Sequence, residues 1–250
     1  MLKKDWEFNT LGVYNYKKDG PLSYYFNYVA KNHERLVGDI LEAGVFQGRS
    51  LLGMALMLKE LGSSKKVYGF DTFSGFPPAY HKCDDLSNFE VLCSQGRISL
   101  EHYEDVLRNK KLREIMLGEE VTEKNISLSG DFGGNSMTVL QRKIQLLELD
   151  NIELVPGPFS ETMSNTKYSD GWCAVLFDCD LYASYHTGLN FVWDDLCSGG
   201  YIYLDEYYSL KFAGARIAVD EFFEDKIEKP FLNTVKEGDF ERWALIKGLE

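Results

Sequence analysis

The sequence lacks an excess of basic residues, and it lacks a long apolar run. Lys and Arg number 27 against 39 Asp and Glu, which gives a formal net charge of −12. A protein that binds nucleic acid through its phosphates needs clustered cations, so we expect no nucleic-acid partner. No stretch approaches the roughly 18 apolar residues of a membrane span, and the start MLKKDWEFNT has no apolar signal core. We therefore expect neither a membrane partner nor a secretory signal.

The sequence also lacks cysteines at metal-binding or redox spacing. Its five cysteines are scattered, and none forms a CxxC pair. This argues against a zinc knuckle or a thioredoxin-type motif. Cys173, Cys179 and Cys197 lie in apolar segments, where we expect buried free thiols. Free thiols fit a reducing compartment, so we expect a cytoplasmic protein.

What the sequence does contain is a regular alternation of apolar strands and helices. The predicted strands lie at 38–44, 65–71, 152–157, 172–180 and 199–206, and the predicted helices at 22–35, 50–61, 138–149, 183–197 and 214–225. Such alternation predicts a parallel sheet with right-handed crossovers. The tail FLNTVKEGDFERWALIKG predicts two more strands, joined by a turn at Gly238 and Asp239 and paired antiparallel at one sheet edge. We expect a single α/β domain over residues 1–250, with about seven strands.

Two segments stand outside this alternation. Residues 1–35 are rich in aromatics and predict a helical N-terminal extension. Residues 79–137 mix polar helix candidates such as LEHYEDVLRNKKLREIM with breaks such as SGDFGGNS. We expect residues 79–137 to form an insertion or a lid-like cover rather than a second domain.

The stretch DILEAGVFQGRS predicts a strand that turns sharply into a helix. Glu42 places a carboxylate near the end of the strand, and Gly44 and Gly48 leave room where backbone must approach a ligand. The same pattern also fits a tight turn that binds nothing. The next strand, VYGFD, ends at Asp71, and an acid there can accept both hydroxyls of a ribose. Together these residues favour a nucleoside-bearing cofactor, for which NAD and S-adenosylmethionine both qualify.

Four acidic residues follow two later strands that we expect to be neighbours. Asp178 and Asp180 follow the strand in VLFDCDLYASYHTG, and Asp205 and Glu206 follow the strand in GGYIYLDEYYS. One strand–helix–strand unit separates the two pairs, so their carboxylates should stand side by side. Carboxylates that converge repel one another until protons or a hard divalent cation neutralise them. Mg²⁺ suits a site of few carboxylates with additional water and substrate oxygens.

Five motifs in this order resemble those of the macrocin O-methyltransferase family. They are ILEAGVFQGRS, GFDTFSGFP, FDCDLYASYHTGL, GGYIYLDEY and GARIAVDEFF, and they cover residues 36–80 and 150–225 but not 81–137. Enzymes of this family are metal-dependent and use S-adenosylmethionine to methylate sugar hydroxyls of macrolides and related natural products. The resemblance implies a class I methyltransferase fold, which is a Rossmann-like sheet with helices on both faces and an antiparallel C-terminal hairpin strand.

The resemblance also implies roles for individual residues. The cofactor would be bound by Glu42, Ala43, Gly44, Gly48, Ser50, Asp71, Thr72, Phe159, Ser160 and Asp178, with Asp71 on the ribose and Phe159 and Ser160 at the adenine edge. The metal, Mg²⁺ or another divalent cation, would be held by Asp178, Asp205 and Glu206. The family more often has two aspartates where this chain has Asp205 and Glu206.

We therefore expect a metal-assisted O-methyltransferase whose acceptor is a small molecule with a hydroxyl, such as a sugar. Asp178, Asp180 and His186 are the candidate general bases, although His186 also fits the exposed face of a helix. Two other functions stay open. The DCD motif resembles the D-x-D of metal-dependent glycosyltransferases, and a methyltransferase-like fold can serve as a catalytically silent binding protein. A homo-oligomer stays open as well.

Overall fold

The computed structural model describes residues 2–77, 80–129, 131–168, 170–234 and 240–248. Within these residues, seven strands form one sheet in the order β3-β2-β1-β4-β5-β7-β6. Strands β1 to β5 run parallel, whereas β7 pairs antiparallel with both β5 and β6. The predicted sheet and its antiparallel C-terminal pair are confirmed. The predicted turn at Gly238 and Asp239 lies outside the described residues.

The strands are β1 (Asp39–Ala43), β2 (Val67–Asp71), β3 (Ile152–Pro156), β4 (Trp172–Phe177), β5 (Leu196–Leu204), β6 (Phe231–Thr234) and β7 (Arg242–Ile246). The α-helices are α1 (Asp5–Leu11), α2 (Ser23–Asn32), α3 (Arg49–Glu60), α4 (Asn88–Ser94), α5 (Leu100–Leu117), α6 (Met137–Leu146), α7 (Phe159–Thr162), α8 (Tyr182–Val192) and α9 (Gly214–Phe222). Short 3₁₀ turns occur at η1 (Lys82–Asp84), η2 (Met163–Asn165) and η3 (Asp205–Tyr207).

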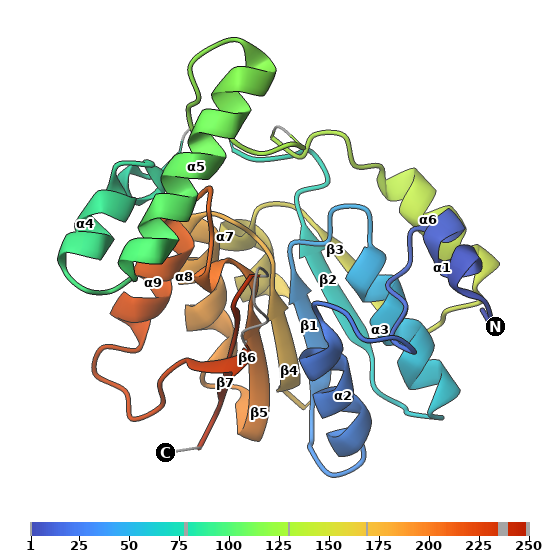
Figure 1. Ribbon diagram of the computed structural model, residues 1–250. Helices are drawn as coiled ribbons and strands as arrows, with labels where there is room; N and C mark the ends of the chain where they lie inside the picture. Colours follow the sequence, from blue (N-terminus) through green and yellow to red (C-terminus); the bar gives the residue numbers. More distant parts are fainter. Residues whose placement is uncertain (1, 78–79, 130, 169, 235–239, 249–250) are drawn as a thin grey trace.

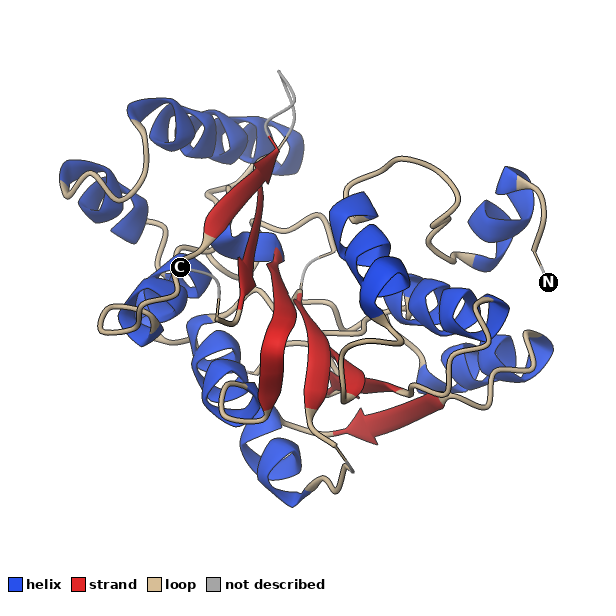
Figure 2. Ribbon diagram, turned by 90° about the horizontal axis from the view of Figure 1, so that it is seen from below, coloured by secondary structure: helices blue, strands red, loops and turns tan. Residues whose placement is uncertain are grey.

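Both faces of the sheet are buried, which explains why its strands read as continuous apolar runs. Successive residues of a strand point to opposite faces, so Ile40 packs on the side of α2 and α3, whereas Leu41 packs on the side of α8 and α9. Figure 2 shows the strands as a central layer with helices on both sides. The result is a three-layer sandwich in which the strand ends form the exposed edges.

The predicted helix over 183–197 is too long. Helix α8 ends at Val192, and β5 begins already at Leu196, which pairs with Trp172 of β4. The β4–β5 register shifts between Trp172 and Ala174, so β5 contains an irregular start before its apolar part. Sequence periodicity could not show where β5 begins, because the start is set by the pairing of Leu196 with Trp172, and Trp172 lies in the strand before α8.

The N-terminal segment is part of the core. Phe8 of α1 and Tyr25 of α2 are both fully buried, and they belong to the cluster that packs against the α3 face of the sheet. Figure 1 shows α1 and α6 on one side of the sheet and α4 and α5 on the other. Removal of the first 35 residues would therefore uncover part of the face that α3 also covers.

The segment over 79–137 packs against the C-terminal half of the chain. Phe89 of α4 and Val106 of α5 share a buried cluster with Ala213 and Ile217 at α9. Helix α5 is thereby fixed against α9 (Figure 1). Among the described residues, no helix combines the length and the apolar character that a membrane crossing requires.

Candidate active site

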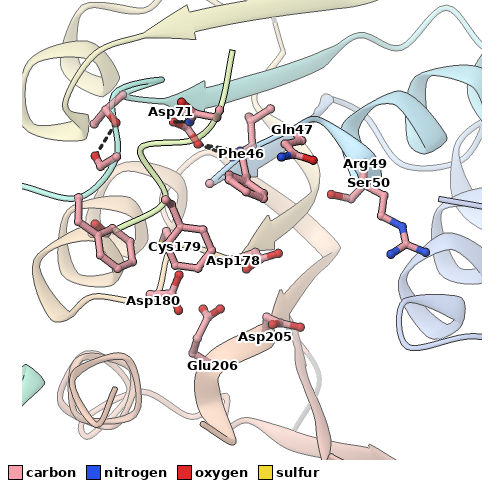
Figure 3. Close-up of a pocket in the computed structure, with 18 of the residues that line it drawn as sticks. Phe46, Gln47, Arg49, Ser50, Asp71, Asp178, Cys179, Asp180, Asp205 and Glu206 are labelled. Carbon is pink, nitrogen blue, oxygen red and sulfur yellow. Dashed lines mark hydrogen bonds between the residues drawn. The ribbon is translucent and has the colours of Figure 1, made fainter. Parts of the chain in front are cut away.

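A cavity of about 1320 Å³ opens at the carboxyl ends of the parallel strands. Strand order reverses between β1 and β4, and ligands of open α/β sheets bind at such a switch point. The wall combines the loops after β1, β2, β4 and β5 with the N-terminal segment before α2. Pockets for one small ligand typically have about 300–1,000 Å³, so this cavity has room for a cofactor beside an acceptor. Figure 3 shows its carboxylates, with Asp178, Asp180, Asp205 and Glu206 gathered on one side.

Two glycines with positive φ tighten the turn after β1. Gly44 has a φ of 93°, and a Cβ placed on it would lie 1.8 Å from the carbonyl oxygen of Asp178. Gly48 has a φ of 77°, and a Cβ there would lie 2.3 Å from Cδ1 of Leu140. The sequence suggested that both glycines leave room for a ligand, whereas both leave room for the chain itself. Of the two, Gly44 lines the cavity and Gly48 does not.

Glu42 lies behind the cavity wall. It is 1 % exposed and is not among the lining residues, and the same holds for the buried Ala43. The Ser50 hydroxyl, which does line the cavity, donates a hydrogen bond to Oε1 of Glu42 at 2.8 Å. Burial raises the pKa of the Glu42 carboxyl well above its usual value, because a buried carboxylate loses its hydration. Glu42 therefore orients Ser50 and does not reach the cavity directly.

Asp71 joins three segments of the cavity wall. Its Oδ2 accepts hydrogen bonds from the backbone N–H groups of Val45 and Phe46, both at 2.8 Å. Its Oδ1 accepts from the N–H of Phe73 at 2.6 Å and from Nδ2 of Asn135 at 3.3 Å. These bonds hold Phe46 at a φ of 49°, a conformation that non-glycine residues rarely adopt. Asp71 also lines the cavity, as a ribose-binding acid must.

Asp178, Asp205 and Glu206 form a cluster of three carboxylates. One oxygen atom of each lies within 4.8 Å of the others. The cluster follows from the sheet, because Phe177 at the end of β4 pairs with Leu204 at the end of β5. Asp180 lies in the same wall with a φ of 58°, outside this group of three.

The carboxylates of the cluster share an environment that opposes ionisation. Loss of hydration, followed by the charges of Asp205 and Asp180, raises the pKa of Asp178. Loss of hydration is also the first cause of the raised pKa values of Asp205 and Glu206. Asp178 nevertheless meets solvent through the cavity, whereas Glu206 is only 6 % exposed. Protons or a cation would relieve this repulsion.

Neighbouring side chains orient the cluster. The Tyr185 hydroxyl donates to Oε2 of Glu206 at 2.7 Å, and the backbone N–H of Glu206 donates to the Tyr185 oxygen at 3.2 Å. Arg242 Nη1 lies 3.9 Å from Oδ1 of Asp205. Lys211 lines the same wall, and its charge opposes the rise in the pKa of Asp180 and of Asp205. The buried Glu206 is thus aimed at the cluster rather than at solvent.

Of the other predicted site residues, Thr72, Phe159 and Ser160 line the cavity. His186 does not line it. Its side chain is exposed on α8, where it stacks on Tyr182 with ring centroids 5.9 Å apart. The structure thus brings most of the cofactor candidates and the carboxylates to one cavity and leaves His186 outside.

The polar residues of the site that sequence reasoning missed include Arg49, Asn135, Tyr185, Lys211 and Arg242. For Tyr185 a signal existed, because Tyr185, Leu189 and Val192 have helical spacing and form the buried face of α8. Arg49 directly follows Gly48, so its place next to the predicted cofactor-binding turn could also be recognised from the sequence. Asn135 reaches the cavity from a loop far away in sequence, and Lys211 follows Glu206 by five residues, but no local pattern marks either of them.

Helix α5 fixes the loop that follows the cluster. His102 is 4 % exposed, and its Nε2–H donates to the carbonyl oxygen of Ser209 at 2.7 Å. Its ring stacks on the cavity-lining Tyr208, with centroids 4.0 Å apart. Asn109 Nδ2 donates to the carbonyl oxygen of Leu210 at 3.0 Å. The segment predicted as a lid-like cover therefore acts as a brace for part of the cavity wall.

Comparison with known proteins gives a family match and a set of similar folds. The macrocin O-methyltransferase (TylF) family model matches residues 26–117 and 136–242. The match reaches further than the motifs in the sequence suggested, because it includes α4 and α5 and leaves out 118–135 within 79–137. A search of curated proteins returned no match.

Several solved structures share the fold at low sequence identity. The O-methyltransferase NovP is 17 % identical with a TM-score of 0.58, over 89 % of this chain and 79 % of NovP. The calicheamicin methyltransferase CalS11, also named as a TDP-rhamnose 3′-O-methyltransferase, is 18 % identical with a TM-score of 0.60, over 97 % of this chain and 79 % of CalS11. An O-methyltransferase from Bacillus cereus, solved with S-adenosylhomocysteine (SAH), is 12 % identical with a TM-score of 0.53, over 99 % of this chain and 93 % of that chain.

These likenesses show the class I methyltransferase fold that the motifs implied. The family match spans most of the chain, including the glycine turn, Asp71 and the carboxylate cluster. The carboxylate cluster argues against the glycosyltransferase interpretation of the DCD motif. In this cluster Asp178 is grouped with Asp205 and Glu206 and not with Asp180, the second aspartate of the motif. The chain belongs to the macrocin O-methyltransferase family.

Proposed function

We propose that this protein is an S-adenosylmethionine-dependent, divalent-metal-assisted O-methyltransferase that acts on a hydroxyl of a sugar or a sugar-bearing small molecule. One observation carries the proposal. A single cavity of about 1320 Å³ contains both the Gly44 turn with Asp71 and the cluster of Asp178, Asp205 and Glu206. A methyl donor and a metal-bound acceptor need such a shared space.

The cofactor assignment is supported by the chemistry of the wall. Asp71 offers carboxylate oxygens suited to ribose hydroxyls, and Phe159 offers an aromatic ring in the same wall. The Bacillus cereus neighbour with the same fold was solved with SAH. These features favour S-adenosylmethionine over NAD, which the sequence had left open.

The donor set fits a hard divalent cation such as Mg²⁺. Asp178, Asp205 and Glu206 supply oxygen ligands alone, and their mutual repulsion needs a positive charge to offset it. The longer side chain of Glu206 reaches the group because Tyr185 holds its carboxyl in place. A divalent cation at this site would acidify and fix the acceptor hydroxyl.

The chain itself would supply positioning and a proton acceptor. Transfer requires the acceptor oxygen, the methyl carbon and the sulfur to lie in line, so a rigid wall provides much of the acceleration. The bonds from Asp71 to the β1 loop and from Tyr185 to Glu206 provide that rigidity. Asp178 and Asp180 are the carboxylates of the wall that can take the hydroxyl proton. His186 is disfavoured for this role because it lies outside the cavity.

The acceptor class follows from the relatives and the remaining lining. CalS11 is named as a TDP-rhamnose 3′-O-methyltransferase, and the family is named for macrocin. In this chain, Tyr208 and Phe240 line the cavity with an edge-on ring contact of 5.8 Å between centroids. Aromatic walls with a few polar groups suit the faces of a sugar ring.

The proposal predicts the behaviour of Asp178→Asn. Transfer of a labelled methyl group from S-adenosylmethionine to sugar-bearing acceptors should require Mg²⁺ and should stop with excess chelator. In the variant, turnover should fall at least about 100-fold, because even the outer partners of metal ligands are worth about 10- to 100-fold. Binding of SAH, measured by calorimetry, should survive in both proteins.

Asp194→Asn is the matched control, since Asp194 is exposed and does not line the cavity. Full turnover of Asp178→Asn in chelator would refute the metal role. Failure of wild-type protein to bind millimolar SAH would refute the cofactor assignment.

A further inference from the structure

Arg49 is a cavity-lining cation whose side chain has no partner among the described residues. It is the first residue of α3, and its side chain is exposed. The two other cations of the lining differ from it. Arg242 lies beside Asp205 at 3.9 Å, and Lys211 acts on the nearby carboxylates. Arg49 therefore brings to the cavity wall a positive charge that no described acid matches.

Arg49 and Asp71 lie on opposite sides of the glycine turn. Figure 3 shows Asp71 at one end of the loop after β1, with Gln47, Arg49 and Ser50 at the other. At the Arg49 end, the backbone N–H of Tyr14 donates to the Arg49 carbonyl oxygen at 2.8 Å, so the N-terminal segment closes the cavity there. A ligand with its ribose on Asp71 would extend along this turn toward Arg49.

The charges of the wall divide the cavity into regions. The side of the cavity that contains the carboxylates of Asp178, Asp205 and Glu206 repels an anion. The start of α3 does not repel an anion, because its first turn has no acidic residue and its N-terminus has no side-chain cap. The helix dipole and the Arg49 guanidinium both favour a negative group there.

We propose that Arg49 binds the carboxylate of the methionine part of S-adenosylmethionine. The inference rests on the proposed cofactor and adds a residue to its recognition. The nucleoside end of the cofactor is uncharged and its other end is an α-amino acid, so the carboxylate is the group that needs a cation. The planar guanidinium can donate to both carboxylate oxygens at once, which a lysine cannot reproduce.

The test compares two ligands that differ in the carboxylate alone. These are SAH and its decarboxylated analogue, S-adenosyl-3-thiopropylamine, titrated by calorimetry into wild-type protein and Arg49→Gln. We expect Arg49→Gln to weaken SAH binding about tenfold or more, a typical size for a charge-assisted hydrogen bond. Affinity for the analogue should change less than about twofold, since it has no carboxylate to lose.

Two further variants make the comparison specific. Arg142→Gln removes the same charge from the exposed face of α6, where Arg142 does not line the cavity, so both affinities should stay as in wild type. Arg49→Lys should recover part of the SAH affinity. Circular dichroism melting of each variant separates a folding defect from a binding defect.

Other results would overturn the proposal. Equal weakening of both ligands would mean that Arg49 shapes the turn and does not bind the carboxylate. Unchanged SAH affinity with a raised KM for an acidic acceptor would assign Arg49 to the acceptor. If the wild-type protein binds neither ligand, the proposed cofactor itself is wrong, and that outcome is distinct from a defect confined to Arg49→Gln.

Discussion

At the scale of single residues, Gly44 joins the two halves of the site. Its Cα faces the carbonyl oxygen of Asp178, and no side chain fits into the space between them. A Cβ 1.8 Å from a backbone oxygen cannot be relieved by a rotamer change, so the strands themselves would have to separate. Gly44 is therefore required for the close packing of the loops that follow β1 and β4, whether or not a ligand is bound.

We expect Gly44→Ala to be strongly destabilising. Its free energy of unfolding should fall by several kcal/mol, beyond the roughly 1–2 kcal/mol that left-handed backbone costs a non-glycine residue. Gly62→Ala is the control, since Gly62 also has a positive φ but a Cβ added there would meet no atom within 4 Å. Urea unfolding of both variants measures the difference, and equal losses would show that backbone strain alone explains the effect.

Some residues of the site could be predicted from the sequence and others could not. Asp71, Asp178 and Asp205 follow apolar strands directly, and the ends of parallel strands lie at one edge of the sheet, so their convergence was predictable. The burial of Glu42 was not predictable, because it depends on the direction in which a side chain near the end of β1 points. Lys211 was missed although it follows Glu206 by only five residues, because the course of an irregular loop does not show in the sequence pattern.

At the scale of elements, α5 determines how the loop after the cluster is held. His102 and Asn109 of α5 hydrogen-bond to the backbone of Ser209 and Leu210, although the sequence predicted that this segment would form a lid-like cover. The apolar positions of α5 are too few to predict a core helix, because much of its surface is exposed. A helix held by a few specific contacts leaves little trace in a hydrophobic pattern.

The buried His102 predicts a pH dependence of stability. Burial, opposed by the bond to Ser209 and reinforced by the charge of Arg216, lowers its pKa below the usual value of 6.5. The unfolded chain therefore takes up a proton before the folded protein does, and stability falls as the pH drops below about 6.5. His102→Gln should lack this loss, so the stability gap between wild type and variant should narrow as the pH falls through this range.

Urea unfolding of both proteins at several pH values measures this effect. The two slopes can differ by at most about 1.4 kcal/mol per pH unit for one proton. Parallel curves over that range would contradict a neutral buried His102. Gln can still donate to the carbonyl oxygen of Ser209, so the variant is expected to fold.

At the scale of the whole molecule, segments from all parts of the chain build one cavity. The N-terminal segment closes one end, α5 braces the other, and β7 contributes Arg242 beside the cluster. The parallel sheet and its antiparallel C-terminal pair were predictable because alternating strands and helices allow few topologies, whereas the strand order was not predicted. The path of residues 79–137 was not predictable, since loops follow no periodicity.

Binding to the assembled cavity should stabilise the whole fold. We expect Mg²⁺ to raise the unfolding midpoint of the wild-type protein and to have a much smaller effect on Glu206→Gln. In chelator the two proteins should be similar, because burial raises the pKa of Glu206 and so disfavours the charge that Gln lacks. Thermal melts with and without Mg²⁺ provide the measurement.

A folding defect is not expected in Glu206→Gln, because the Tyr185 hydroxyl can donate to the amide oxygen of the variant as it donates to the Glu206 carboxylate. An equal response of both proteins to Mg²⁺ would exclude Glu206 as a ligand. With SAH at about 100 times its Kd, both should gain about 2.7 kcal/mol.

The contact of Gly44 with Asp178 also has a thermodynamic consequence. The backbone of Gly44, in the proposed donor loop, packs directly on that of Asp178, in the proposed metal site, so we expect the proposed methyl donor and cation to influence each other's binding. If the cation raises the affinity of the protein for the methyl donor by some factor, the donor must raise the affinity for the cation by the same factor. Cooperativity between them would let the enzyme discriminate against either ligand alone and assemble its full site when both are present.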